Sequence, residues 1–419
     1  MPGQTAICLK KHQDVKLRKL IAYAYEYVGY YRQLFDQHGI RVEDIQTTAD
    51  LVKIPLTKKT DLLDFPEGHI VSCDKQLGKL KVEQSSGSTG MPFKVHMDRN
   101  YLFTRNLRFL RGLYLCGYRW PMKLLLVTGG DGRKESVPRR WMYSSIKDSA
   151  ESLYEQYRAY QPSVLYGCTT PLRLLAEYIE ANGLSVATPR TVITTAESVD
   201  RYTRLLLTRV FLAPVYDFYG MTEMGLIGWQ CSAQQDYHLA GDSIITELVG
   251  LAGSGEAHLV YTNLDLYGMP LIRFDSGDIG GSLKSGICSC GQGLERLDRV
   301  EGRDVDAVIL EDGRRLSPYR FTCEIEKISG IKRYKVIQDD LNHFRVQVEL
   351  TDAGEAGIGA KEETRGMKAD AKNTKMQIEL KMQEILGKDM DVGVELMAKI
   401  PHVAGQKFRA VESAVDVKH

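Results

Sequence analysis

Residues 84–92 read QSSGSTGMP and follow a strand-like stretch at 78–83. Positions 85–90 are all small, four of them with hydroxyl groups and two of them glycine. Glycine lets the backbone approach an anion closely, and successive N–H groups can form a concave anion-binding nest. A flexible Ser/Gly linker has the same composition. The stretch alone therefore leaves two interpretations, a phosphate-binding loop and a linker.

The composition is that of a globular protein. The chain has 419 residues, 43% of them hydrophobic and 26% charged, enough for two or three domains of roughly 100–200 residues each. The net charge of +1 gives no drive toward nucleic acid or an anionic membrane. No apolar run is long enough for a transmembrane helix, and residues 1–11 lack the apolar core of a signal peptide. Because 8 cysteines are too few for a disulfide scaffold, we expect reduced thiols and a cytoplasmic location.

Hydrophobic periodicity predicts an amphipathic helix over 13–38. Between 120 and 290, strand-like and helix-like segments alternate. We expect strands at 123–128, 190–195 and 215–219, helices at 171–182 and 201–212, and an antiparallel strand pair at 244–249 and 256–262. This alternation predicts an α/β domain of helix-covered β-sheets.

After residue 302 the pattern changes to a short βαββαβ series. We expect strands at 305–310, 332–338, 343–350 and 392–398, and helices at 318–328 and 372–386. This order predicts a small ferredoxin-like α+β domain. We therefore expect a large N-terminal domain at 1–303 and a small mobile C-terminal domain at 304–419.

Residues 216–223, YDFYGMTE, end a predicted strand with aromatic rings, a glycine, a hydroxyl and a carboxylate. An aromatic face can stack on a purine. A single carboxylate beside phosphates suits Mg²⁺, which keeps several waters and shares oxygens of the substrate. A core strand that ends in a turn is the alternative interpretation.

Three further charged residues lie where they could contact a nucleotide or a reacting group. Asp278 follows a glycine turn, where a carboxylate can accept two ribose hydroxyls or serve only the turn. Arg303 lies at the predicted domain boundary, where it could reach a nucleotide or be an ordinary surface arginine. Lys407 lies in a glycine-containing loop and could supply positive charge to a developing oxyanion or remain solvated.

These sequence motifs, taken together and in order, indicate a protein family more specifically than any one motif does. The series SSGSTG, AE, YGMTE, DSGD, GR and GQK, in this order, resembles the adenylate-forming superfamily of acyl- and aryl-CoA ligases. The resemblance is closest to the phenylacetate-CoA ligase-like branch, which includes CapK-type proteins, and it covers nearly the whole chain. It implies an adenylate-forming fold, with a large N-terminal domain of helix-covered sheets and a small C-terminal domain.

The resemblance also implies which residues bind the nucleotide. The β- and γ-phosphates of ATP would lie in the loop formed by Ser85, Ser86, Gly87, Ser88, Thr89 and Gly90. Glu197 would lie near the adenine, and the segment Phe218, Tyr219 and Gly220 would stack on the adenine and line the substrate site. Asp278 would bind the ribose, and Arg303 would be the nucleotide-binding arginine at the hinge. In the catalytic set, Thr222 would contact the α-phosphate, Glu223 would bind Mg²⁺, and Lys407 would be the adenylation lysine.

The implied reaction is the ATP-dependent activation of a carboxylic acid, with an aryl acid as first choice. The acid becomes an acyl-AMP with release of pyrophosphate, and the acyl group then passes to the thiol of coenzyme A. Between the two steps the C-terminal domain would rotate about a hinge at Asp304 or Asp306. Two alternatives stay open, transfer to an amine or hydroxyl and a nucleotide-binding scaffold without catalysis. We expect a small-molecule acid as partner, no nucleic acid and no membrane, and leave a homodimer open.

A possible metal site is formed by two pairs of soft ligands, Cys231 with His238 and Cys288 with Cys290. Three thiolates and one imidazole suit tetrahedral Zn²⁺, and four protein ligands would make the site structural. The C-x-C spacing is tighter than usual, and unrelated buried cysteines are the alternative. The resemblance favours zinc, because phenylacetate-CoA ligase-like proteins often carry a similar quartet.

Overall fold

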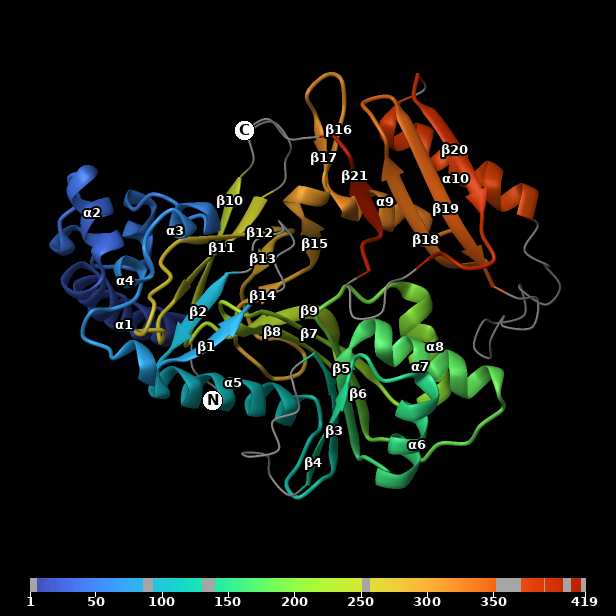
Figure 1. Cartoon of the computed structure of the whole chain (residues 1–419), viewed down its shortest axis with the longest axis horizontal. Coiled ribbons are helices and arrows are strands. Elements are labelled where there is room, and N and C mark those ends of the chain that lie inside the picture. Colours follow the sequence, from blue (N-terminus) through green and yellow to red (C-terminus); the bar gives the residue numbers. More distant parts are fainter. Residues whose placement is uncertain are drawn as a thin grey trace. The chain divides into compact units, whose positions relative to one another are not determined.

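The computed structural model describes residues 6–85, 93–129, 140–250, 257–351, 371–387, 389–401 and 408–415. The chain divides into two compact units. Unit 1 contains residues 1–117, 216–250 and 257–300, and unit 2 contains residues 118–215, 251–256 and 301–419. Each unit combines helices with β-sheets, which confirms the predicted α/β class (Figure 1). The functional division at residue 303 stays a prediction.

Unit 1 begins with a group of helices, which lie beside strands of the same unit and share its apolar core (blue in Figure 1). They are α1 (Ala6–Tyr27), α2 (Gly29–Gln37), η1 (Val42–Asp44), η2 (Thr48–Lys53), α3 (Lys59–Leu63), α4 (Glu67–Ile70) and η3 (Leu77–Lys79). The single helix predicted over 13–38 is two helices, because Val28 has an extended backbone between them. Its predicted buried stripe, which includes Leu17, Ile21 and Phe35, is confirmed.

The sheets of unit 1 are antiparallel. A hairpin of β1 (Lys81–Gln84) and β2 (Lys94–Met97) leads into α5 (Arg99–Leu115). One sheet contains β13 (Leu283–Lys284), β14 (Arg296–Leu297), β9 (Gln234–Leu239), β8 (Gly225–Cys231) and β7 (Val215–Met221), in that order. Another contains β10 (Ile244–Gly250), β11 (Ala257–Asn263) and β12 (Phe274–Gly280). The predicted antiparallel pair is β10 and β11, with Ile244 opposite Asn263.

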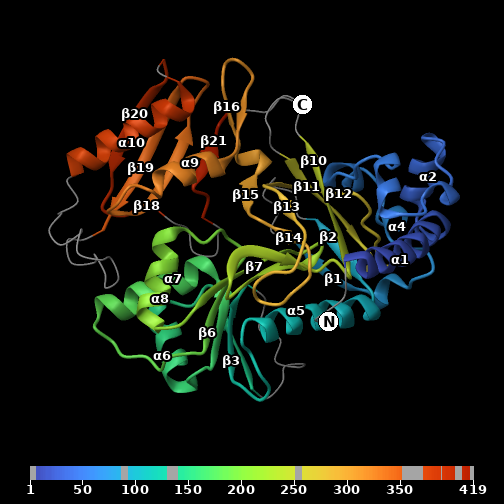
Figure 2. The ribbon, with the colours of Figure 1, turned by 180° about the vertical axis from the view of Figure 1, so that it is seen from behind.

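The first part of unit 2 is a parallel sheet of buried, apolar strands. Its strands are β4 (Trp141–Ser145), β3 (Leu124–Thr128), β5 (Val164–Cys168) and β6 (Thr191–Thr195), in that spatial order. The helices α6 (Ala150–Tyr160), α7 (Thr169–Ala181) and α8 (Arg201–Phe211) cover one face of it (Figures 1 and 2). All predicted elements of this region are confirmed. The strands β4 and β5 and the helix α6 were not predicted.

The C-terminal part of unit 2 is an α+β arrangement. It contains β15 (Val300–Arg303), η4 (Asp304–Asp306), β16 (Val308–Ile309), β17 (Arg315–Leu316), α9 (Pro318–Ile325), β18 (Ile331–Gln338), β19 (His343–Leu350), α10 (Ala371–Leu386), β20 (Asp391–Leu396) and β21 (Val411–Ser413). Helices α9 and α10 pack on one face of the sheet β20-β19-β18-β21 (Figure 2).

The strand order corrects one detail of the ferredoxin-like prediction. A strand at 305–310 should have joined the sheet, but only Val308–Ile309 is extended, and it pairs with β17 outside the sheet. The residues before it form η4, where Asp304 and Asp306 are ion-paired to Arg315 and Arg409. The short strand β21, parallel to β18, completes the sheet instead.

Within the described residues, no helix combines the length and the apolar character that crossing a membrane requires.

Candidate functional site

The base of the predicted phosphate loop is closed by a pair of hydrogen bonds. Ser86, Gly87, Ser88, Thr89 and Gly90 lie outside the described residues, so only Ser85 can be placed. The Ser85 N–H donates to the Phe93 carbonyl at 2.9 Å, and the Phe93 N–H donates to Ser85 Oγ at 3.3 Å. The buried Phe93 ring stacks on Phe274, with ring centroids 6.3 Å apart. Both ends of the segment 86–92 are therefore anchored in the core of unit 1.

Thr222 and Glu223 lie in the tight turn between β7 and β8. A Cβ at Gly220 would lie 2.5 Å from the carbonyl oxygen of Gly225, so only glycine fits where the two strands meet. The register of the pair is irregular at the same place, between Tyr219 and Gly220. Glu223 is only 8% exposed. The turn thus holds a largely buried carboxylate in a fixed backbone frame.

Two arginines on one face of α5 connect the phosphate loop and the Glu223 turn. Arg105 donates to the Glu83 carboxylate of β1 at 2.7 Å. Arg108, three residues further along the helix, donates to the carbonyl of Met224, the residue after Glu223, at 2.9 Å. Arg108 is buried, and its Nε and Nη1 have no hydrogen-bond partner among the described residues. Helix α5 therefore contacts both β1, which leads into the predicted phosphate loop, and the turn that contains Glu223.

Replacing Arg108 with methionine should lower kcat/KM for ATP about tenfold, because one charged hydrogen bond to the Glu223 turn is lost. Arg99→Met is the matched control, since Arg99 is an exposed arginine on the same helix. The measurement is ATP–pyrophosphate exchange at varied ATP. Equal kcat/KM values for the two variants would show that Arg108 does not position the turn.

Asp278 and two tyrosines form a hydrogen-bonded chain in unit 1. Tyr219 donates its hydroxyl to Asp278 Oδ2 at 2.6 Å, and Tyr261 donates to the Tyr219 hydroxyl at 3.1 Å. Burial, followed by the nearby Asp278 charge, raises the pKa of Tyr219 well above its usual value; burial does the same for the pKa of Tyr261. Both phenols therefore stay protonated near neutral pH and orient the Asp278 carboxylate.

Phe218 points to the opposite side of β7 from Tyr219, as alternation along a strand requires. Its ring is 1% exposed and packs edge-on against Phe109 of α5, with centroids 6.2 Å apart. Because almost none of its surface is exposed, Phe218 is a core residue in this structure. Of the predicted aromatic pair, Tyr219 is the one that contacts Asp278.

Glu197, which belongs to unit 2, lies against the first turn of α7. The Thr170 N–H donates to its carboxylate at 3.2 Å, and the Thr170 hydroxyl donates to the same oxygen. A carboxylate at a helix N-terminus is stabilised by the unpaired N–H groups there. Glu197 thus has a structural partner in addition to its predicted place near the adenine.

Arg303, also in unit 2, ends β15 directly before η4. Both predicted pivots follow it and are engaged by cations, Asp304 by Arg315 and Asp306 by Arg409. Lys407 lies outside the described residues.

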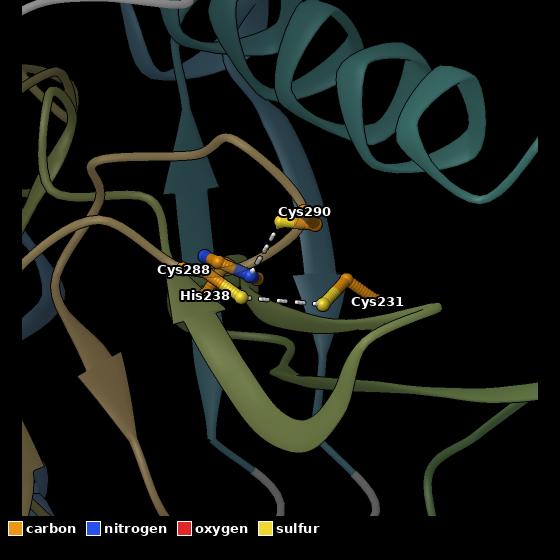
Figure 3. Close-up of side chains that lie close together, drawn as sticks. All are labelled: Cys231, His238, Cys288 and Cys290. Atoms are coloured by element: carbon orange, nitrogen blue, oxygen red, sulfur yellow. Dashed lines mark hydrogen bonds between the residues drawn. The ribbon is translucent and has the colours of Figure 1, made fainter.

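The four predicted metal ligands come together in unit 1. Cys231 ends β8, His238 lies in β9, and Cys288 and Cys290 lie in the connection between β13 and β14. Their ligand atoms all lie within 4.8 Å of one another. Figure 3 shows the four side chains pointing toward a common centre. All cysteines are free thiols, so no disulfide competes for these sulfurs.

The distances within this cluster match a tetrahedral zinc site. Zn–S bonds of about 2.3 Å and Zn–N bonds of about 2.0 Å place two sulfurs about 3.8 Å apart, and a sulfur and a nitrogen about 3.5 Å apart. Cys231 Sγ and Cys288 Sγ are 3.8 Å apart, and Cys290 Sγ and His238 Nε2 are 3.4 Å apart. Burial, with the Arg296 cation, lowers the pKa of His238 to about 4, so its imidazole is neutral, the form that binds metal.

No family model matches the chain. Two proteins named phenylacetate-coenzyme A ligase are similar to it over most of their length. That of Thermus thermophilus is 26% identical over 372 residues, 82% of each chain. That of Escherichia coli (strain K12) is 24% identical over 432 residues, 96% of this chain and 94% of the relative. The chain is thus similar in sequence to phenylacetate-CoA ligases.

Solved structures show that the chain has the fold of adenylate-forming CoA ligases. A 2-hydroxyisobutyryl-CoA ligase in complex with 2-HIB-AMP matches it with a TM-score of 0.80 at 20% identity, over 99% of this chain and 90% of that chain. An anthranilate CoA ligase in complex with anthranoyl-AMP matches with a TM-score of 0.54 at 13% identity, over 86% of this chain and 73% of that chain.

Sequence reasoning missed the residues that hold the predicted site in place, chiefly Arg105, Arg108 and Tyr261. Arg105 and Arg108 are spaced three apart in the segment YLFTRNLRFL, which places them on one face of a helix, and this spacing was a usable signal. Tyr261 lies in an ordinary strand pattern, and only the pairing of β11 with β12 brings it near Asp278.

Proposed function

We propose that this chain is an ATP-dependent acid–thiol ligase that converts a carboxylic acid into its coenzyme A thioester. The observation that carries the proposal is the similarity to phenylacetate-CoA ligase over 96% of the chain. The fold supports it, because the matching solved structures are CoA ligases with acyl-adenylates bound.

The reaction has two balanced steps. A carboxylate oxygen of the acid attacks the α-phosphorus of ATP, the bond from that phosphorus to the bridging oxygen breaks, and pyrophosphate leaves. The thiol of coenzyme A then loses its proton to solvent and attacks the acyl carbon, and AMP leaves with the electrons of the broken C–O bond. The first step brings an anionic carboxylate to an anionic triphosphate, so positive charge at the α-phosphate is its main catalytic requirement.

The predicted site residues divide this task. Ser85 to Gly90 would hold the β- and γ-phosphates, so that the loop binds the leaving pyrophosphate rather than a transferred group. Thr222 would contact the α-phosphate, and Lys407 would place its ammonium against the developing charge. Glu223 suits Mg²⁺ because it offers one carboxylate in a fixed, largely buried turn, and the bound ion would neutralise phosphate charge. Asp278, oriented by Tyr219, would accept the ribose hydroxyls.

An aryl acid is the proposed substrate class, with phenylacetate as the first candidate because both named relatives carry it in their names. The test is ATP–pyrophosphate exchange with phenylacetate, benzoate, 2-hydroxyisobutyrate and short aliphatic acids, followed by addition of coenzyme A. We expect exchange with at least one aryl acid and a thioester of the same acid. An adenylate that reacts with an amine or hydroxyl but not with coenzyme A would overturn the proposed acceptor.

The four-ligand cluster is proposed to bind one structural Zn²⁺ per chain. Cys290→Ser should remove the metal and lower the thermal midpoint, because a metal bound only by the folded state stabilises that state. Cys73→Ser is the matched control, since Cys73 is an exposed free thiol. Elemental analysis of both purified variants decides the matter, and equal zinc contents would contradict the proposed ligand set.

The proposal extends to the organisation of the enzyme. The C-terminal domain, 304–419, would rotate relative to the N-terminal domain, 1–303, between adenylation and thioester formation. Asp304 or Asp306 would be the pivot of this rotation. The ion pairs of these residues with Arg315 and Arg409 would be kept or exchanged in that rotation. We infer a cytoplasmic location from the need for ATP and coenzyme A, and size-exclusion chromatography would test homodimerisation.

A further inference from the structure

The backbone of β12 forms a bulge at Asp278, in the antiparallel pair of β11 and β12 in unit 1. The pairs that flank the bulge, one residue from each strand, are His258 with Ile279 and Val260 with Asp275. Between them lies only Leu259 on β11, but residues 276–278 on β12. Bulges bend the strand that carries them, and they occur often next to active sites, where they redirect a side chain.

The carboxylate of Asp275, at the start of the bulge, holds two groups at once. Its Oδ1 accepts the N–H of Gly277 at 3.0 Å, and Gly277 has a φ of 71°, in the left-handed region that favours glycine. Its Oδ2 lies 2.9 Å from His258 Nδ1 of β11. Since a carboxylate only accepts, the hydrogen lies on Nδ1 and His258 is the donor. The two side chains are 9% and 15% exposed, so water competes little for this hydrogen bond.

The hydroxyl of Ser276 joins the bulge to the opposite strand. It donates to the Leu259 carbonyl of β11 at 2.6 Å and accepts the N–H of Asp278 at 3.1 Å. A side chain thus satisfies backbone groups that a regular ladder would pair with each other. Ser276 therefore holds the backbone of Asp278, while Tyr219 holds its carboxylate.

Both ends of the bulge are anchored within unit 1. Before it, the Asp275 N–H donates at 2.9 Å to the carbonyl of Thr57, a fully buried residue. After it, Gly280 passes so close to β11 that an added Cβ would lie 2.6 Å from the Leu259 side chain. With both ends fixed, the side-chain hydrogen bonds within the bulge set the path of the backbone between them.

We propose that His258, Asp275 and Ser276 are positioning residues that shape this bulge and so orient the Asp278 carboxylate toward the ribose of ATP. The inference rests on the proposed function, in which Asp278 accepts the ribose hydroxyls. Hydrogen bonds to the ribose are made equally in the bound substrate and in the transition state. Loss of the positioning residues should therefore weaken nucleotide binding without slowing the chemical step.

The test is equilibrium binding, by titration calorimetry with Mg²⁺ and without acid, of ATP and of 2′,3′-dideoxy-ATP, which lacks both ribose hydroxyls. Because a hydrogen bond to a charged group changes affinity about 10- to 100-fold, the unaltered protein should prefer ATP by about that factor. We expect His258→Leu and Ser276→Ala to lower this preference about 3- to 10-fold. The loss should come from weaker ATP binding, with binding of the dideoxy nucleotide unchanged. Ser276→Thr keeps the hydroxyl and should retain the preference.

Two matched controls remove the same chemical groups elsewhere. Ser282→Ala removes an exposed hydroxyl that follows the bulge and donates to Asp298. His343→Leu removes an exposed imidazole that is likewise hydrogen-bonded to an aspartate, Asp340. Both controls should keep the full preference for ATP. Asp278→Ala is the reference for complete loss of the preference.

The outcomes separate this inference from the proposed function. A full preference in His258→Leu and Ser276→Ala, with none in Asp278→Ala, would overturn the positioning role and leave the proposed function intact. Equal weakening of both nucleotides would show a merely structural bulge and also overturn it. A full preference in Asp278→Ala, or none in the unaltered protein, would overturn ribose binding by Asp278 and the positioning role with it. Expected binding preferences without pyrophosphate exchange for any acid would support the positioning role and overturn only the proposed ligase activity.

Discussion

Replacing Lys407 with alanine will abolish acid-dependent ATP–pyrophosphate exchange while ATP binding is retained. The physical reason is that a carboxylate and a triphosphate, both anionic, must meet at the α-phosphorus. An ammonium placed against the developing charge acts mainly in the transition state, and loss of such a group costs roughly 100- to 1,000-fold in rate. The second step, attack of the thiol on the acyl carbon of a preformed acyl-AMP, forms no bond to phosphorus and should be spared.

Lys399→Ala is the matched control for this prediction. Lys399 is an exposed lysine just before Ile400, so it carries the same charge as Lys407 without the predicted role. The measurement pairs pyrophosphate exchange with thioester formation from synthetic acyl-AMP. Equal exchange rates in the two lysine variants would contradict the assignment of Lys407.

Replacing Glu223 with glutamine will lower the adenylation rate and raise the concentration of Mg²⁺ needed for half-maximal exchange. The amide has nearly the shape of the carboxylate, so the tight turn between β7 and β8 should fold normally. What is lost is one negative oxygen ligand, and Mg²⁺ binds through only one or two protein carboxylates. We expect a loss of roughly 100-fold at limiting Mg²⁺, partly recovered at high Mg²⁺.

The control for Glu223 is Glu43→Gln, an exposed carboxylate of unit 1 outside the predicted site. A Mg²⁺ titration of exchange activity separates the two variants. If Glu223→Gln shows the Mg²⁺ dependence of the unaltered protein, another residue binds the ion.

Local patterns predicted much of the α/β core, because short runs rich in apolar or β-branched residues, such as 123–128 and 190–195, favour buried strands. They failed where tertiary contacts outweigh local preference. The break in the first helix at Val28 had a local signal that periodicity overlooked, because Val28 is followed by Gly29, a poor helix former. The strand expected at 305–310 is shortened because the residues before Val308 form η4, in which Asp306 is ion-paired with Arg409 from near the C-terminus. The three-residue strand β21 is too short to leave a pattern.

In the candidate site, too, residue chemistry was predictable from sequence, whereas contacts that depend on packing were not. Cys231, His238, Cys288 and Cys290 were predicted from residue chemistry, and the structure brings their ligand atoms together. Phe218 and Tyr219 could not be separated by sequence, because which face of β7 meets α5 depends on packing. Arg108 was not predicted as a site residue, since its hydrogen bond to Met224 joins positions 116 residues apart.

The most direct test of the proposed activity is exchange of radiolabelled pyrophosphate into ATP, measured with and without an added carboxylic acid. The account predicts exchange only when an aryl acid such as phenylacetate is present, and conversion of that acid to its coenzyme A thioester when coenzyme A is added. No exchange with any acid of the panel, while ATP still binds, would contradict the account and indicate a nucleotide-binding protein without this catalysis.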